Sequence, residues 1–196
     1  MPIGQAKFGL LGGVADLDNL ILIETIEASG VTEVYFDDIQ EDIYGVHILT
    51  ANEQRCGTGT NVTAKVRLWE NGVKNTTSGA YEYVFHNIRS DGTYFFSKGS
   101  QSHLFITAAQ GVANSDYSSA GYMYLWNLGD SGAYSMGYIY GMGNPSDDAS
   151  RTYTGTVNLA NKSLVNGISI DFGGTSSFDG KYSLYGVKNT IWAIYI

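Results

Sequence analysis

The 196-residue sequence predicts an all-β antiparallel sandwich with little helix. Its 15 Tyr and 8 Phe lie with Val and Thr in short runs, and its 25 Gly lie with Asn, Asp and Ser between those runs. Aromatic and β-branched residues favour strands, whereas Gly, Asn and Asp favour turns. No window keeps an apolar repeat of 3.6 residues, which is the pattern of an amphipathic helix. We therefore expect strands joined by turns along the whole chain.

The clearest strand is Val62–Trp69, because its apolar and polar side chains alternate, which indicates one buried face. It leads into Asn71-Gly72, a pair that tolerates the positive φ values of a tight hairpin turn. The other predicted strands are Asn19–Ala28, Val31–Phe36, Tyr44–Ala51, Ala80–Ile88, Thr93–Phe96, His103–Ala108, Gly121–Leu128, Tyr134–Met142, Thr152–Leu159, Gly167–Phe172 and Tyr182–Val187. About twelve strands at this spacing are typical of a sandwich or barrel.

The N-terminal residues 1–18 are irregular and punctuated by glycine. We expect them to form an arm ahead of one sandwich domain over residues 19–190. Large apolar side chains of the arm would be exposed on an isolated domain, and each gains roughly 1.5–3 kcal/mol on full burial. The residues predicted to dock on a partner protein are Ile3, Phe8, Leu10, Leu11 and Val14.

The C-terminal residues 191–196 are apolar on both faces of an extended segment. An outer strand of a sandwich has one face in water, so this segment needs two apolar surfaces. One can be the core of its own chain and the other a neighbouring subunit, as closed symmetry allows. The predicted oligomer contacts are Ile191, Trp192, Ile194, Tyr195 and Ile196.

Composition argues against two classes of partner. The 11 Lys+Arg are scattered and outnumbered by 19 Asp+Glu, giving a net charge of −8, so we expect no nucleic-acid binding. Every apolar run is far shorter than the roughly twenty residues that span a bilayer, so we expect no membrane insertion. The single Cys56, in a predicted loop over residues 55–60, cannot form an intramolecular disulfide.

Catalytic groups are not suggested by any motif. The carboxylate pairs Asp16/Asp18, Asp37/Asp38 and Asp147/Asp148 are neighbours in sequence, and such neighbours diverge on a strand or are solvated in a loop. No G-x-S-x-G nucleophile motif occurs. We expect no catalytic residue, and hence no enzyme.

Metal and cofactor sites are not suggested either. His47, His86 and His103 lie on three different predicted strands without metal-ligand spacing. The acidic run that starts at Asp16 lacks the later Gly and Glu of a twelve-residue calcium loop, although calcium at the acidic loops stays open. We expect no cofactor.

The unusual chemical feature is a concentration of aromatic side chains, most of which share parity on two predicted strands. Tyr and Trp join a large apolar surface to a polar group, which suits sugar stacking and protein interfaces. Alternate tyrosines are also ordinary residues of a core or of a sheet surface. The candidate glycan-binding residues are Tyr122, Tyr124, Trp126, Tyr138 and Tyr140.

Several segments together resemble a recurrent pattern in single-domain β-sandwich proteins of tailed bacteriophages. The pattern has a strand, an acidic turn, a D-x-Y strand, later Thr-rich and Tyr-rich strands and a closing Tyr-Gly strand. The matching segments are Ala6–Gly13, Val31–Ile39, Asp42–Leu49, Gly59–Trp69, Ala80–Phe85, Gly121–Asn127 and Gly180–Lys188. The resemblance covers most of residues 1–189 and rests on β patterns without a catalytic signature. The extension over residues 191–196 departs from it.

The resemblance implies a jelly-roll-like sandwich in a capsid decoration protein or a short tail-fibre or tail-tip subunit. Such proteins are commonly trimeric and have no enzymatic activity. It therefore implies a homotrimer that binds other virion proteins and is assembled into virions in the host cytoplasm. A carbohydrate-binding adhesin that attaches to host glycans is the alternative, and a glycan-degrading enzyme is a third possibility that only turnover on host polysaccharide would support.

Overall fold

A computed structural model describes residues 19–56, 63–107, 118–143, 150–173 and 176–188. These residues form thirteen strands and no α-helix, which confirms the predicted all-β class. The strands are β1 (Leu20–Val31), β2 (Glu33–Phe36), β3 (Tyr44–Cys56), β4 (Lys65–Glu70), β5 (Val73–Lys74), β6 (Tyr81–Arg89), β7 (Tyr94–Gln101), β8 (Leu104–Phe105), β9 (Ser119–Trp126), β10 (Tyr134–Gly143), β11 (Arg151–Lys162), β12 (Val165–Asp171) and β13 (Phe178–Lys188).

Each of the twelve predicted strands overlaps an observed one, and the thirteenth is the two-residue β5. β5 forms a hairpin with β4 across the predicted turn, where Asn71 and Gly72 have φ values of 51° and 80°. Some limits differ from the prediction. β3 continues to the buried Cys56, which had been placed in a loop, and β7 continues to Gln101 beyond the predicted end at Phe96.

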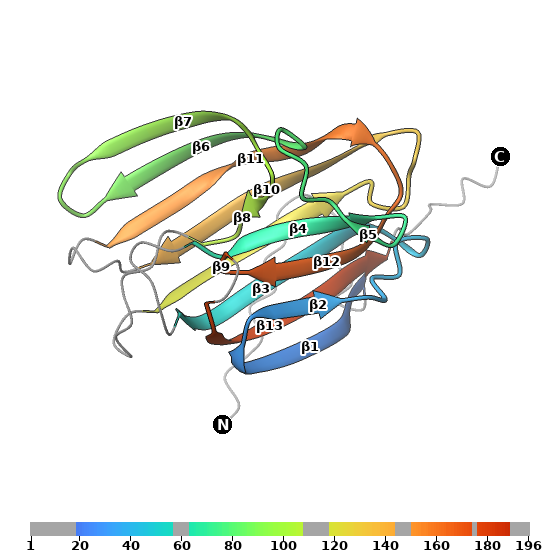
Figure 1. The fold of residues 1–196 in the computed structure, drawn as a ribbon, viewed down its shortest axis with the longest axis horizontal. Coiled ribbons are helices and arrows are strands. Elements are labelled where there is room, and N and C mark those ends of the chain that lie inside the picture. Colours follow the sequence, from blue (N-terminus) through green and yellow to red (C-terminus); the bar gives the residue numbers. More distant parts are fainter. Residues whose placement is uncertain (1–18, 57–62, 108–117, 144–149, 174–175, 189–196) are drawn as a thin grey trace, which may run out of the picture.

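The strands form two antiparallel sheets (Figure 1). The large sheet has eight strands in the order β1-β13-β3-β9-β10-β11-β6-β7. The small sheet has the order β2-β12-β4-β5, and β8 also pairs with β4. In the view of Figure 1 the small sheet lies in front of β13 and β3, while β6 and β7 extend beyond it.

The strand pairing is nested, as in a jelly roll. β1 pairs with β13, β2 with β12, β3 with β9 and β4 with β5, so each pair is enclosed by the one before it. Successive members of this series alternate between the two sheets, which wraps the chain around a shared core. The strands β10, β11, β6 and β7 then continue the large sheet beyond β9.

The core lies between the inner faces of the two sheets, and both sheets contribute alternate side chains to it. The large sheet contributes Leu49, Met123, Leu125, Ile139 and Leu184, and the small sheet contributes Val66, Leu68, Ile168 and Ile170. All of these side chains are almost completely buried. This alternation explains why the period-2 pattern of the sequence predicted the strands so well.

Tyr81 connects the two sheets through its hydroxyl group. The edge of β4 pairs with β8 at Lys65–Val66 and with β5 at Trp69–Glu70, which leaves Leu68 between the two ladders. The Leu68 N–H donates to the Tyr81 hydroxyl at 2.9 Å. That hydroxyl in turn donates to the Asn75 carbonyl oxygen at 3.2 Å. Burial raises the pKa of Tyr81, so the hydroxyl keeps its proton. The side chain thus completes a backbone ladder.

His47 anchors the segment between β2 and β3. Its ring is fully buried, and Nε2 lies 2.7 Å from the Ile39 carbonyl oxygen. Burial lowers the pKa of His47, so the ring is neutral and Nε2 carries the proton that it donates to this carbonyl. The histidine therefore has a structural role on β3.

We predict that Tyr81→Phe lowers the free energy of unfolding by about 1–3 kcal/mol, because it leaves the buried Leu68 N–H without an acceptor. Tyr122→Phe, at an exposed tyrosine of the same sheet, is the matched control and should change it by less than about 0.5 kcal/mol. Urea unfolding followed by circular dichroism measures both. Equal stability of the two variants would contradict the role assigned to Tyr81.

Candidate functional site

The five aromatic residues singled out in the sequence lie together on the outer face of the large sheet. We call this set, Tyr122, Tyr124, Trp126, Tyr138 and Tyr140, the tyrosine face. It occupies β9 and β10, whose register places Tyr122 opposite Tyr140 and Tyr124 opposite Tyr138. The side chains of Tyr122 and Tyr138 are 37% and 38% exposed. The side chains therefore form a surface rather than part of the core.

The rings of the tyrosine face pack against one another in a fixed arrangement. Tyr122 stacks on Tyr140 with centroids 5.5 Å apart, and Tyr124 stacks on Trp126 at 5.9 Å. Tyr122 and Tyr124 meet edge to face at 5.7 Å and link the two stacks. Such contacts reduce the rotamer freedom that a ligand would otherwise have to restrict.

Hydroxyl groups give this apolar surface a polar character. The Tyr138 hydroxyl lies 2.7 Å from Thr154 Oγ1 on β11. Partial burial, followed by the neighbouring tyrosines, raises the pKa of Tyr122, so its hydroxyl keeps its proton at neutral pH. An uncharged aromatic surface with hydroxyl donors and acceptors can stack on an apolar ring face and hydrogen-bond to its edge, as a sugar requires.

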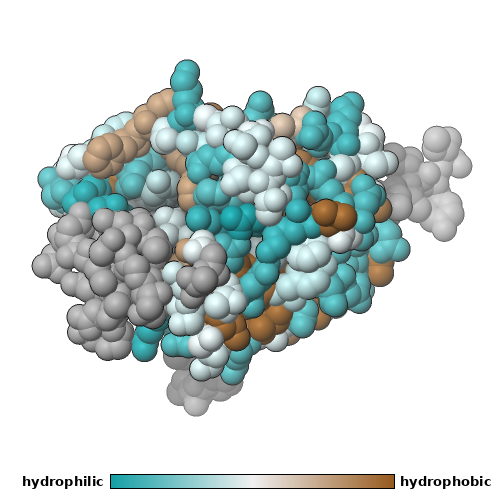
Figure 2. Space-filling model, viewed as in Figure 1, coloured by the Kyte–Doolittle hydropathy of each residue, from teal (hydrophilic) through white to brown (hydrophobic). Residues whose placement is uncertain are grey.

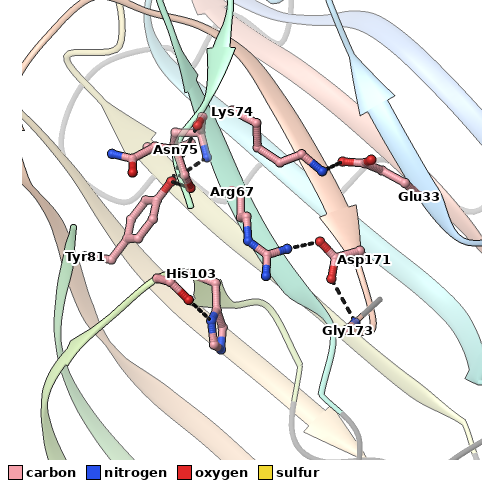
Figure 3. Close-up of polar contacts among 10 residues, drawn as sticks. Glu33, Arg67, Lys74, Asn75, Tyr81, His103, Asp171 and Gly173 are labelled. Atoms are coloured by element: carbon pink, nitrogen blue, oxygen red, sulfur yellow. Dashed lines mark hydrogen bonds and ion pairs between the residues drawn. The ribbon is translucent and has the colours of Figure 1, made fainter. Parts of the chain in front are cut away.

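The outer face of the small sheet carries a different set of groups (Figure 3). Arg67 on β4 forms an ion pair with Asp171 on β12, and Lys74 on β5 forms one with Glu33 on β2. Asp171 also accepts the Gly173 N–H at 2.8 Å. These pairs line a shallow open depression together with threonine side chains. The opposite charges neutralise one another, so the arrangement ties the strands of the small sheet together.

An aromatic pair stands beside these ion pairs. The rings of Tyr35 and Trp69 lie 4.3 Å apart and meet over Gly167, where a β-carbon would come within 2.8 Å of the Tyr35 hydroxyl oxygen. The Lys74 ammonium lies 5.9 Å from the Trp69 ring. Sequence reasoning did not single out this group. The sequence shows Gly167 and Trp69 only as separate residues. The pairing of β12 with β4 was needed to place them opposite each other.

Figure 2 shows the side of the molecule on which the small sheet lies. Most of this surface is hydrophilic, and its hydrophobic groups form a band at one end and small separate patches elsewhere. The tyrosine face belongs to the other sheet, so it and the Arg67–Asp171 and Lys74–Glu33 ion pairs occupy different outer faces of the sandwich.

His103 lies just before β8 and is half-buried. Its ring packs edge to face on Phe105 at 4.8 Å. Burial first, and then the positive charges of Lys65 and Arg67, lower the pKa of His103 to about 4. The imidazole is therefore neutral under ordinary conditions. A charged His103 would have to share a partly dry site with two cations.

Other predicted positions are not brought together in one site. His47, His86 and His103 belong to three separate parts of the fold. In the described ranges there is no group of three or more His, Cys, Asp or Glu that could hold a metal ion. No helix long and apolar enough to cross a membrane is found among the described residues. Asp37 and Asp38 lie exposed between β2 and β3, whereas the pairs Asp16/Asp18 and Asp147/Asp148 lie outside the described residues.

The two terminal sets of predicted contacts also lie outside the described residues. They are the docking residues Ile3, Phe8, Leu10, Leu11 and Val14, and the oligomer contacts Ile191, Trp192, Ile194, Tyr195 and Ile196. Both sets stay predictions.

We predict that His103→Gln weakens the pH dependence of stability. The pKa of His103 is about 4 in the folded chain and 6.5 in a free ring. Between pH 6.5 and pH 4, His103 is therefore protonated in the unfolded chain and neutral in the folded chain. His103 therefore makes the parent less stable as the pH falls toward 4. Because solvent partly screens the half-exposed ring, the free energy of unfolding should fall by roughly 1 kcal/mol less in the variant than in the parent between pH 7 and pH 5.

Urea unfolding at the two pH values checks this expectation. His86→Gln, at an exposed histidine on β6, is the matched control for the loss of a histidine ring. Identical losses for the parent and for the His103 variant would show that this ring is not titrating as described.

Comparison with protein-family models, with curated proteins and with solved structures finds no match for this chain.

Proposed function

We propose that this protein is a compact, non-enzymatic structural subunit on the surface of a tailed-phage virion, either a capsid decoration protein or a short tail-fibre protein. The observation that carries the proposal is the nested jelly-roll pairing, which is the architecture that the sequence resemblance implied. A fold alone does not fix a function, so the proposal also depends on the segments that resemble phage proteins.

The proposal assigns a role to each part of the chain. Residues 1–18 dock on another virion protein, the sandwich is displayed outward, and residues 191–196 pack in the core or on a neighbouring subunit of a homotrimer. The tyrosine face supports an outward-facing role, because a broad aromatic surface on a globular domain commonly contacts another molecule. Assembly occurs in the host cytoplasm, where virions form.

Deleting residues 1–18 should leave a folded sandwich and abolish incorporation into particles. The described strands begin at Leu20, so the deletion removes none of their pairings. Circular dichroism reads the fold, and antibody labelling of purified particles reads incorporation at the head or the tail. A truncated chain that still enters particles would refute docking by the arm. Loss of the β-sheet signal would show instead that the segment belongs to the core.

A carbohydrate-binding adhesin is the second candidate function. The geometry of the tyrosine face favours it: stacked rings expose apolar surface, and hydroxyls such as that of Tyr138 lie at their rims. The ring of a sugar has apolar C–H faces and a polar edge, which this combination complements. The two functions are compatible, since a virion subunit can also attach the particle to a host surface.

Tyr122→Ala combined with Tyr138→Ala should reduce binding to any glycan that the parent captures on an array by at least tenfold. The double variant removes the two most exposed rings of the set and leaves the inner face of the sheet intact. Tyr35→Ala, which removes a tyrosine from the small sheet, is the control and should bind as the parent does. Binding unchanged in the double variant, or no glycan captured by the parent, would exclude this second candidate.

A further inference from the structure

β7 is an open edge of the large sheet. It lies at one end of the strand order and pairs only with β6 among the described strands. Residues 94–100 are exposed, and its three aromatic side chains are each about half exposed: Tyr94 54%, Phe95 49% and Phe96 54%. Figure 2 shows a band of hydrophobic surface where Figure 1 places the β6–β7 hairpin. An exposed apolar edge of this kind is a template for another strand.

Apart from one lysine, the usual protections against edge pairing are lacking in β7. Its register with β6 runs through eight residue pairs without a bulge, it has no proline, and Lys98 is its only charged residue. β1, the other edge of the same sheet, differs. It has two register irregularities and carries Glu24 and Glu27. The contrast indicates that β1 is better protected against edge pairing than β7.

The direction of the backbone groups in β7 follows from its hairpin. The Arg89 N–H donates to the Thr93 carbonyl at 2.9 Å, so Thr93 faces β6. Backbone groups alternate in direction along an antiparallel strand. The N–H and C=O groups of Tyr94, Phe96, Lys98 and Ser100 therefore point away from β6 and toward the open side.

The chemistry of β7 is complementary to itself when the strand is reversed. Tyr94, Phe95 and Phe96 form an aromatic half, and Lys98, Gly99 and Ser100 form a cationic and small half. We propose that β7 pairs antiparallel with β7 of a second copy, about a two-fold axis at Ser97.

In this register Phe96 lies opposite Lys98 of the second copy, and Phe95 lies opposite its Gly99. The first pair joins a cation to an aromatic face. The second places Phe95 opposite a residue that has no side chain, next to the Tyr83 ring that already contacts Gly99. Because the contact is two-fold symmetric, each pair occurs twice. The outward backbone groups of Phe96 also meet those of Lys98. The result is one continuous sheet across two copies, a contact separate from residues 191–196.

Charge substitutions at Phe96 distinguish the β7–β7 register from nonspecific hydrophobic association. Phe96→Lys places two like charges opposite each other twice and should raise the dissociation constant at least tenfold. Phe96→Glu removes the same ring but places a carboxylate opposite Lys98, so it should bind at least tenfold more tightly than Phe96→Lys. Leu22→Lys, at an exposed position on the β1 edge, is the control and should match the parent. Analytical ultracentrifugation of the full chain measures all four proteins.

Disulfide crosslinking tests whether the two-fold axis passes through Ser97. Cysteines at Ser97 would face each other across the two-fold axis, whereas cysteines at Ser100 would lie about 20 Å apart by the strand rise. The one native cysteine among the described residues is the buried Cys56. Oxidation should therefore give covalent dimers of Ser97→Cys and none of Ser100→Cys. Equal weakening by the two Phe96 variants, absence of the Ser97 crosslink, or occupation of β7 only by another protein would overturn the proposal.

Discussion

The position of β13 between β1 and β3 is the constraint on which the rest of the structure depends. β13 is the last described strand, yet it forms two long pairings of the large sheet, with Leu20 opposite Val187 and Leu49 opposite Leu184. Bringing segments so distant in sequence together costs loop entropy, which only the combined core can offset. The pairs β2–β12, β3–β9 and β4–β5 are nested inside the β1–β13 pair. The inner faces of both sheets can meet over one core for the same reason.

The arrangement also separates the chemistry of the two outer faces. Side chains alternate across a strand, so every inward apolar residue is flanked by outward ones that the core does not constrain. On β9 and β10 of the large sheet, several outward positions are aromatic and form the tyrosine face. On the small sheet they form ion pairs such as Arg67–Asp171, with the Tyr35–Trp69 pair beside them. Tyr81 joins the sheets from within, where its hydroxyl serves as an acceptor for a backbone amide. The two outer faces thus carry different chemical groups.

Local pattern was sufficient for most of the fold. The alternation in Val62–Trp69 predicted β4, because burial of one face selects apolar residues at every second position. Asn71-Gly72 predicted its turn, because few other residues adopt positive φ values. The pattern failed where pairing overrode composition. The polar end of β7, through Gln101, has a turn-like sequence and stays extended because β6 pairs with it throughout. β8 is shorter than its predicted run because only Leu104 and Phe105 pair with β4.

By itself the sequence determined the all-β class, the positions of twelve strands and the shared parity of the aromatic residues, since each is a property of neighbours along the chain. Tertiary structure alone decided which strands adjoin. It placed Tyr122 against Tyr140, set Gly167 beneath Tyr35 and Trp69, and left β7 at an open edge. The physical reason is that periodicity reports the face on which a side chain lies. The neighbour on that face depends on register between distant strands, which is fixed by packing of the whole core.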